Sequence, residues 1–244
     1  MTDPAPTPGG GTRGVGGSGT LGQPRLHLQV TASTNTRAQE LAAAGAPHGT
    51  LVTAREQTAG RGRQGRTWTA PAGRALLCSL VIRHPRPLLA LTAGVAVAEV
   101  AGADAQVKWP NDVLVKGRKV AGILVEGRPQ EDWAVLGIGL NVALSPEDFP
   151  PDLRDQAGTL GLSPAEIEPT LSRLLDSLTA WLGRSDKEIL AAFATRDALR
   201  GKMVIWDQGR GRAHGVNDRG CLLVTAGDGG EHALSAGEVH LVQE

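Results

Sequence analysis

The sequence predicts an α/β (α+β) protein in which a mixed sheet with flanking helices is followed by a small all-β barrel. Three observations support this class. Strand-like and helix-like segments alternate up to about residue 200, one nearly all-apolar helix must lie against a sheet, and short strands separated by Gly, Asn and Asp fill the chain from Lys202 onward. We therefore expect two domains, residues 25–200 and 201–244.

The first elements follow a change in composition. Residues 1–24 are rich in Gly, Pro, Thr and Ser and offer almost nothing to bury, so they are predicted to form a disordered tail. LHLQV, from Leu26, alternates as a strand does. A helix is predicted over STNTRAQELAAAG, with Thr36 and Gln39 spaced as a capping box and an end near Gly45.

The remaining elements of the first domain alternate in the same way. LVTA (51–54) and ALLCSLVI (75–82) are typical of buried strands, and Pro87 opens the apolar helix LLALTAGVAVAEVAG. QVKW, DVLVKG, KVAGILVEG and WAVLGIGLNV are predicted as four strands joined by tight turns. Two helices follow, at about Ser163 to Gly183 and Asp186 to Leu199. MVIWD, GRAHGVN, CLLVTA and ALSAGEVHLV are then the strands of the barrel.

Composition excludes several classes of function. The 25 basic and 25 acidic residues cancel, which argues against a general nucleic-acid coat. No apolar run approaches the roughly 20 residues that cross a bilayer, and MTDPAPTPGG lacks the regions of a secretory signal, so we expect a cytoplasmic protein without a membrane partner. Cys78 and Cys221 have no CxxC or His cluster beside them, so no metal site is predicted from side-chain motifs and both are expected to be core thiols.

A loop rich in arginine and glycine is the first candidate site. Across Arg55 to Arg74 there are five arginines and one acid, Glu56. Arginine forks match phosphate or carboxylate oxygens in two-point contacts, and glycine lets backbone amides approach an anion closely. The stretch predicts an anion-binding loop that is mobile until an anion orders it. The alternative is a solvated surface loop or a nucleic-acid contact. The GxxxxGK[ST] phosphate-binding motif is absent from the sequence, so a nucleotide site would need another design.

The second candidate site is KWPNDVLVKGRKVAGILVEG, residues 108–127. Pro110 forces Trp109 out of the helical region, and Asn111-Asp112 favours a turn, so polar side chains gather at a strand end. Lys119, on the following strand, would stabilise charge that develops near phosphates. Gly122 leaves room for a group to lie flat on the sheet. A plain hairpin with one stray charge is the alternative.

Taken together, GRGRQGRTW, KWPNDVLVKGRKVAGILVE and GIGLNV, preceded by STN at 33–35, resemble the biotin protein ligase family in its form without an N-terminal DNA-binding domain. The resemblance is strong from about Leu26 to Asn141 and looser beyond. It implies a mixed sheet like that of class II aminoacyl-tRNA synthetases, a C-terminal SH3-like β-barrel, and ATP and biotin as substrates with Mg²⁺. No DNA partner is expected, and a homodimer through a sheet edge is left open.

The reaction that the resemblance implies has two steps. The carboxylate of biotin attacks the α-phosphate of ATP to give biotinyl-5′-AMP and pyrophosphate, and a lysine of a biotin carboxyl carrier domain of a biotin-dependent carboxylase then attacks the mixed anhydride. Cationic side chains with Mg²⁺ would screen the repulsion between carboxylate and polyphosphate. A closed loop would keep water from the anhydride.

The resemblance also implies roles for individual residues. The catalytic residues are Lys119, Arg63 and Asp112. The biotin-binding residues are Ser33, Thr34, Asn35, Gln57, Arg61, Gly62, Arg63, Lys119 and Gly122. The ATP-binding residues are Arg63, Arg66, Lys108, Asn111, Lys119 and Asn141. Considered alone, Ser33 and Thr34 are also helix caps, Asn111 and Asp112 turn formers, and Asn141 a strand end. Trp68 either packs over the ligand or anchors the end of the loop.

Three alternatives to this function stay open at this point. A lipoate or octanoate ligase or transferase shares the fold and a carrier lysine. A nucleic-acid-binding module would use the RGRQGR patch and bind less tightly as salt increases. A transcriptional repressor without catalysis would need a reading helix that the sequence does not display.

Overall fold

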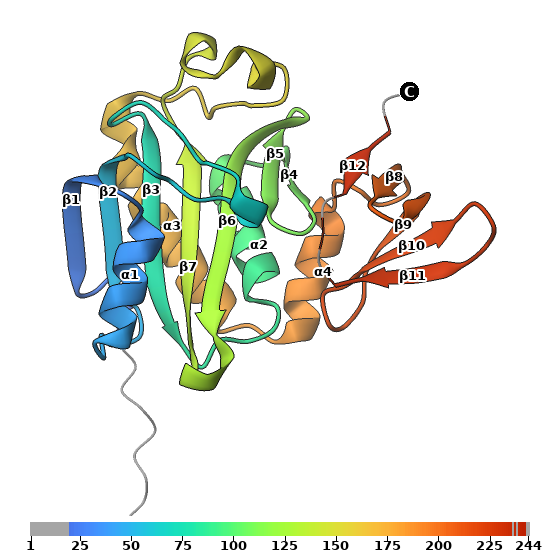
Figure 1. The fold of residues 1–244 in the computed structure, drawn as a ribbon, viewed down its shortest axis with the longest axis horizontal. Coiled ribbons are helices and arrows are strands. Elements are labelled where there is room, and N and C mark those ends of the chain that lie inside the picture. Colours follow the sequence, from blue (N-terminus) through green and yellow to red (C-terminus); the bar gives the residue numbers. More distant parts are fainter. Residues whose placement is uncertain (1–19, 236, 238, 243–244) are drawn as a thin grey trace, which may run out of the picture.

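A seven-stranded mixed sheet forms the body of the protein (Figure 1). The computed structural model describes residues 20–235, 237 and 239–242. The strand order is β1-β2-β3-β7-β6-β5-β4. β1 and β2 run parallel and the other neighbouring pairs run antiparallel, so the predicted mixed sheet is confirmed. The strands are β1 (Arg25–Thr31), β2 (Leu51–Gln57), β3 (Ala75–Arg83), β4 (Ala105–Lys108), β5 (Asp112–Val115), β6 (Arg118–Arg128) and β7 (Trp133–Asn141).

Helices cover the two faces of this sheet unequally. α1 (Thr34–Ala43) lies on one face, where Ala38 packs against Val52 and Val81. α2 (Leu89–Ala101), α3 (Ile167–Leu182) and α4 (Asp186–Arg196) form a layer on the other face (Figure 1). α2 is apolar on all sides because it lies between the sheet and the other two helices of that layer. The face that carries α1 is left partly open for a site.

The start of α1 differs from the prediction. The helix begins at Thr34 with Ser33 as its N-cap, and the Ser33 side chain makes no capping hydrogen bond in the described chain. The capping box expected at Thr36 and Gln39 is wrong, since both residues lie within the first two turns of the helix. The capping-box spacing gave the wrong residues because Thr34 and Asn35, at the start of the helix, direct their side chains toward the sheet and not back onto the helix.

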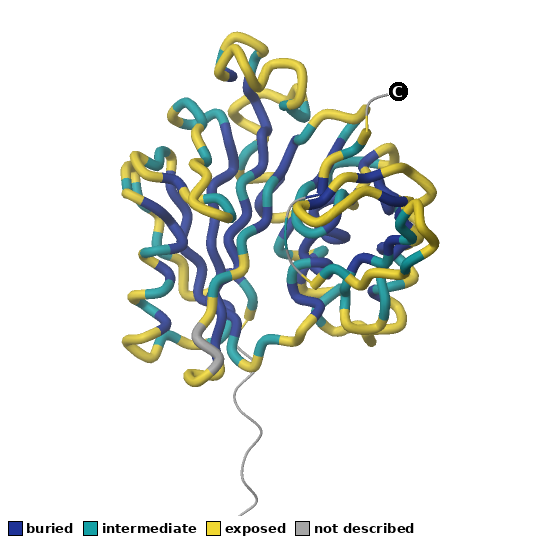
Figure 2. The backbone as a smooth tube through the Cα atoms, turned by 45° about the vertical axis from the view of Figure 1, so that its right-hand side comes forward, coloured by how far each residue is buried: buried dark blue, intermediate teal, exposed yellow. Residues whose placement is uncertain are grey.

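The C-terminal part is a second, five-stranded antiparallel sheet with the order β11-β10-β9-β8-β12. Figure 2 shows that it curls around a buried inner lining. Within the described residues the sheet is open, with β11 and β12 at its edges. The single strand expected over ALSAGEVHLV is wrong, because this segment contains the end of β11 and, separately, β12. The strands are β8 (Met203–Trp206), β9 (Gly209–Val216), β10 (Leu222–Ala226), β11 (Glu231–Leu234) and β12 (His240–Leu241).

The two sheets share one apolar core. Val204 and Leu222 of the second sheet belong to the same buried cluster as α2. The indole N–H of Trp109, which is 2% exposed, donates to the carbonyl of Gly220 at 2.9 Å. The predicted boundary near Arg200 falls between α4 and β8, and the independence of the two domains stays a prediction.

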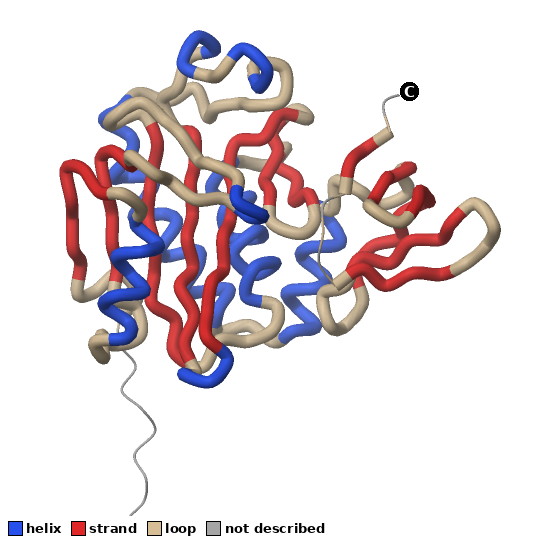
Figure 3. Tube along the Cα trace, in the orientation of Figure 1, coloured by secondary structure: helices blue, strands red, loops and turns tan. Residues whose placement is uncertain are grey.

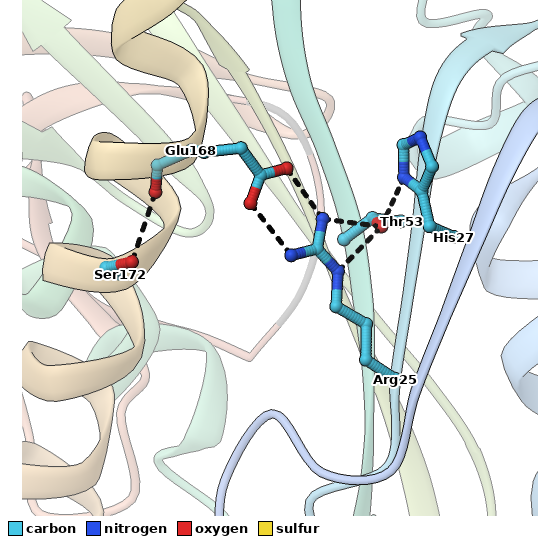
Figure 4. A network of polar contacts seen from close by, with 5 residues as sticks. All are labelled: Arg25, His27, Thr53, Glu168 and Ser172. Carbon is cyan, nitrogen blue, oxygen red and sulfur yellow. Dashed lines mark hydrogen bonds and ion pairs between the residues drawn. The ribbon is translucent and has the colours of Figure 1, made fainter.

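The edge strand β1 is attached to the helical layer by a polar network (Figure 4). Arg25 donates to both carboxylate oxygens of Glu168 on α3, at 2.7 and 2.8 Å, and to the hydroxyl of Thr53 at 3.1 and 3.2 Å. These hydrogen bonds hold the pKa of Glu168 below its ordinary value. Just before β1, Gly22 N–H donates to Gly49 at 2.8 Å, so the end of the predicted tail packs against the body. Residues 1–19 of that tail lie outside the described residues.

None of the helices in the described part of the chain combines the length and the apolar character needed to cross a membrane.

Candidate active site

A cavity of about 830 Å³ opens on the sheet face that carries α1. Its walls come from strands β2, β3, β6 and β7, from the loop after β2, from the segment after β7 and from residues 239–241 of the C-terminal part. Figure 3 shows both long loops running over the ends of the strands. The volume lies within the range of small-molecule sites, roughly 300–1,000 Å³. All fourteen residues predicted for the site line it: Ser33, Thr34, Asn35, Gln57, Arg61, Gly62, Arg63, Arg66, Lys108, Asn111, Asp112, Lys119, Gly122 and Asn141.

One end of the cavity is neutral, polar and buried. Thr34 donates from its backbone N–H and its hydroxyl to Oε1 of Gln57, at 2.8 and 3.0 Å. The hydroxyl of Ser79 lies 2.8 Å from the hydroxyl of Thr34 and donates to Oδ1 of Asn35 at 2.6 Å. Ser79 is fully buried in β3. Sequence reasoning missed it, although a polar residue within the apolar run ALLCSLVI was a signal, because buried hydroxyls need partners.

Asn35 is fixed by contacts on every side. A Cβ at Gly137 would lie 2.0 Å from Asn35 Oδ1, so only glycine fits beneath it. The side-chain amide nitrogen of Asn35 donates to Oε2 of Glu126 at 2.9 Å. Glu126, on β6, also forms an ion pair with Arg61 of the arginine loop. Glu126 is a second residue that sequence reasoning missed.

The arginine loop forms part of the cavity wall, with Arg61, Arg63 and Arg66 among the lining residues. A single turn, Arg63–Gly65, is closed by the hydrogen bond from Gly62 N–H to the Arg66 carbonyl at 2.7 Å. Arg63 donates to Oδ1 of Asn111 at 3.1 Å, which joins the two candidate sites of the sequence in one wall. The expected mobility of this loop stays a prediction.

Trp68, at the end of that loop, lies on the sheet. A Cβ at Gly122 would come within 2.9 Å of its ring and a Cβ at Gly139 within 2.5 Å. The two glycines thus leave a flat bed on β6 and β7 for the indole. The indole nitrogen is buried and has no hydrogen-bond partner in the described chain. The ammonium of Lys119 lies 5.6 Å from the ring centroid.

Lys119 is held at its head group and at its backbone. Its ammonium lies 2.7 Å from Oδ1 of Asp112. Its backbone N–H donates to Gln156 at 2.7 Å, and its carbonyl accepts from Gly158 N–H at 2.8 Å. Asn141 completes this support, because its amide donates to the Gly158 carbonyl at 2.9 Å. The segment 156–158 was not singled out in the sequence.

The cysteines of the described chain offer no reactive thiolate in the cavity, and its acidic and metal-ligating side chains form no metal cluster. Burial raises the pKa of Cys78 to about 12, so this cavity-lining thiol is protonated at neutral pH and is no nucleophile. Both cysteines are free thiols. In the part of the chain that the structure describes, no three His, Cys, Asp or Glu side chains gather to hold a metal. The cavity therefore offers a neutral polar end and a cationic end, suited to a ligand with a polar head and anionic groups.

Comparison with known proteins places this cavity in context. The sequence pattern of the Biotin/lipoate A/B protein ligase family matches residues 27–142. The chain is similar to the Bifunctional ligase/repressor BirA of Bacillus subtilis, with 43% identity over 158 residues that cover 60% of this chain and 49% of that protein. It thus spans about half of that relative.

Two further similarities extend over most of the chain. The Biotin–[acetyl-CoA-carboxylase] ligase of Mycobacterium tuberculosis is 35% identical over 231 residues, which cover 86% of this chain and 85% of that protein. The structure is also similar to that of the biotin protein ligase from Aquifex aeolicus in complex with biotin and ATP. That comparison has a TM-score of 0.77 and 27% identity, and covers 91% of this chain and 100% of the other.

Proposed function

Because the chain belongs to the biotin protein ligase family, we propose that it activates biotin with ATP to biotinyl-5′-AMP and transfers the biotinyl group to a lysine of a biotin carboxyl carrier domain. The observation that carries this proposal is the two-ended cavity. A polar floor, made of the buried Thr34 and Asn35 and the half-buried Gln57, adjoins a cationic wall at Arg63 and Lys119.

The polar floor suits the ureido ring of biotin. That ring presents one carbonyl acceptor and two N–H donors, and the floor offers hydroxyl and amide groups of both kinds. Ser33, Thr34, Asn35 and Gln57 are the proposed ring contacts. Gly62, Gly122 and Arg61 are the further proposed contacts of biotin.

The cationic wall suits the reacting groups. A carboxylate and a triphosphate repel each other, and Arg63 and Lys119 can hold both while stabilising the charge that develops at the α-phosphate. Asp112 orients the ammonium of Lys119 through their ion pair. The proposed nucleotide contacts are Arg63, Arg66, Lys108, Asn111, Lys119 and Asn141. MgATP enters as the substrate, and its metal is carried by the phosphates.

Exclusion of water is the task proposed for the arginine loop and Trp68. A mixed anhydride hydrolyses if water reaches it, and a loop that folds over the bound ligand would restrict access. Residues 239–241 also line the cavity. We propose that the curled C-terminal sheet is an SH3-like barrel and the main sheet a relative of class II aminoacyl-tRNA synthetases.

The proposal extends to partners and location. The carrier domain of a biotin-dependent carboxylase is the proposed macromolecular substrate, in the cytoplasm, and DNA is not part of the proposal. A homodimer through the edge strand β1, where Val30 is 55% exposed, completes it. Analytical ultracentrifugation that gives only monomer at high concentration would remove the dimer from the proposal.

A lipoate or octanoate ligase is the competing function of the same family. The ring of lipoate has no hydrogen-bonding atoms, so it would make no hydrogen bonds with the polar groups of Thr34, Asn35 and Gln57. A site built to bind polar groups rejects an analogue that lacks them by about 10⁴- to 10⁵-fold. The buried polar floor therefore favours biotin.

Pyrophosphate release from MgATP is the experiment that tests the function. Release is measured with biotin, lipoate and octanoate in turn, and mass spectrometry then follows an added carrier domain. We expect release with biotin alone and a carrier that gains the mass of one biotinyl group. Turnover with lipoate but not with biotin would overturn the proposal.

A further inference from the structure

Glu126 joins two parts of the site that are far apart in the sequence. One carboxylate oxygen accepts from the amide of Asn35, on the floor, and the other pairs with Arg61, in the arginine loop. The sequence separations are 91 and 65 residues. Glu126 does not itself line the cavity, so it acts through these two neighbours.

The two contacts of Glu126 differ in strength because they differ in exposure. The side chain of Arg61 is 46% exposed and that of Glu126 is 21% exposed, so water screens their ion pair. Asn35 is 4% exposed. Without Glu126 its amide nitrogen would keep only the longer hydrogen bond to the Leu124 carbonyl, at 3.4 Å, among those that the described chain makes, and a buried amide that loses a partner is disfavoured. A ligand can therefore displace Glu126 from Arg61 at little cost while Asn35 stays fixed.

The positive charge of the loop favours replacement of Glu126 by another anion as the partner of Arg61. Arg61, Arg63 and Arg66 lie within six residues of one another, and their repulsion is relieved by an acidic partner. A substrate carboxylate offers the same two oxygens to a guanidinium as Glu126 does. The pair thus holds the loop near its working position before the substrate arrives.

We infer that Glu126 is a positioning residue that holds Arg61 over the empty site until the carboxylate of the substrate takes its place, and that orients Asn35 throughout. This inference rests on the proposed function only where it names that carboxylate. Glu126→Gln separates the two roles, since glutamine can still accept from Asn35 but carries no charge for Arg61. Glu126→Ala removes both.

Limited trypsin digestion tests the tie to the loop without any substrate. Trypsin cleaves after arginine, and mass spectrometry counts cuts after Arg61, Arg63 and Arg66 in the ligand-free full chain. Both Glu126 variants should be cut about two- to fivefold faster than wild type, as expected for the loss of a partly exposed ion pair. The control is Glu56→Gln, on β2. The side chain of Glu56 makes no ion pair in the described chain, so cleavage of this variant should match that of wild type.

Steady-state kinetics tests the tie to the floor. Glu126→Ala should raise the KM for biotin about tenfold or more, with kcat changed less than about threefold, because uniform binding is lost. Glu126→Gln should stay within about threefold of wild type in both constants. Circular dichroism confirms that each variant is folded, and the glutamine variant preserves the test if the alanine variant is not.

The outcomes are distinct. Unchanged cleavage in Glu126→Gln, or an equal rise in Glu56→Gln, overturns the holding role. An unchanged KM in Glu126→Ala overturns the orientation of Asn35. If wild type shows no biotin-dependent turnover, the proposed function fails, whereas the trypsin result still decides the role of Glu126.

Discussion

The ammonium of Lys119 lies 2.7 Å from Oδ1 of Asp112, and both side chains line the same cavity. The pair is made by the register of adjacent strands, in which Asp112 opposes Gly122 and a bulge shifts Lys119 toward it. The ion pair with Asp112 therefore orients the ammonium of Lys119, whose side chain is otherwise flexible.

Asp112→Asn should lower kcat for biotin-dependent pyrophosphate release about 10- to 100-fold, with a smaller change in KM. The amide preserves shape but leaves the ammonium of Lys119 without its charged partner, so the cation is less well placed for the developing charge. Asp104→Asn, at an exposed position before β4, is the matched control and should retain wild-type rates. Equal rates in the two variants would show that Lys119 is positioned by other means.

Gly139→Ala should displace Trp68 and destabilise the protein by roughly 1–3 kcal/mol, because the new methyl group would overlap the indole. Denaturant unfolding gives the free energy, and the fluorescence difference between proteins with and without Trp68→Phe isolates this indole among the five tryptophans.

Gly183→Ala is the control for that substitution. A Cβ at Gly183 would meet nothing nearer than 3.5 Å, and its φ of −82° suits alanine. If the Gly139→Ala protein is as stable as this control, the contact of the Trp68 indole with Gly139 contributes nothing to the free energy of unfolding.

Trp109→Phe should cost about 1–3 kcal/mol of unfolding free energy and raise the KM for ATP. The substitution removes the hydrogen bond to Gly220 that connects the two sheets, and residues 239–241 of the second sheet line the cavity. Trp181→Phe loses a comparable bond, to Glu99 at the surface, and should cost less than about 1 kcal/mol. If ATP binding is unchanged in Trp109→Phe, the second sheet does not depend on this bond for its place at the cavity.

Asp197 should make stability depend on pH. Burial raises the pKa of its carboxyl, while backbone N–H groups of Leu199 and Arg200 oppose the shift. Because the folded pKa exceeds the ordinary value of 3.8, the unfolded chain ionises first, and stability is lost as pH rises from there through the folded pKa. Asp197→Asn should therefore gain stability relative to wild type across this window and keep the gain above it. Unfolding curves of both proteins at several pH values give the difference in their free energies of unfolding. A difference that becomes smaller as pH rises would contradict the prediction.

Much of the fold was accessible from the sequence because its signals are local. The strands QVKW, DVLVKG and KVAGILVEG were placed by apolar runs and the Lys116-Gly117 turn, and the structure confirms a turn there with positive φ at both residues. At the start of α1, Ser33 was offered as a cap and is the N-cap residue, whereas the capping box at Thr36 and Gln39 is wrong. The side chains of Thr34 and Asn35 make hydrogen bonds with residues of the sheet, and such tertiary contacts outweigh the local preference.

The residues of the site that were missed share one physical reason. Ser79 and Glu126 matter through partners that are 44 to 91 residues away, and no motif or period encodes such a distance. Gly122 was expected to leave room for a flat group, and the structure places the indole of Trp68 there. The sequence suggested the space, but only the fold identifies its occupant.

The backbone of Lys119 and the segment 156–158 are joined by two hydrogen bonds, one to each side of the lysine peptide. In amide hydrogen exchange, the N–H groups of Lys119 and Gly158 are therefore protected by one opening event and should have closely similar protection factors. A ligand that slows one will slow the other, so a probe of the segment is at the same time a probe of the lysine.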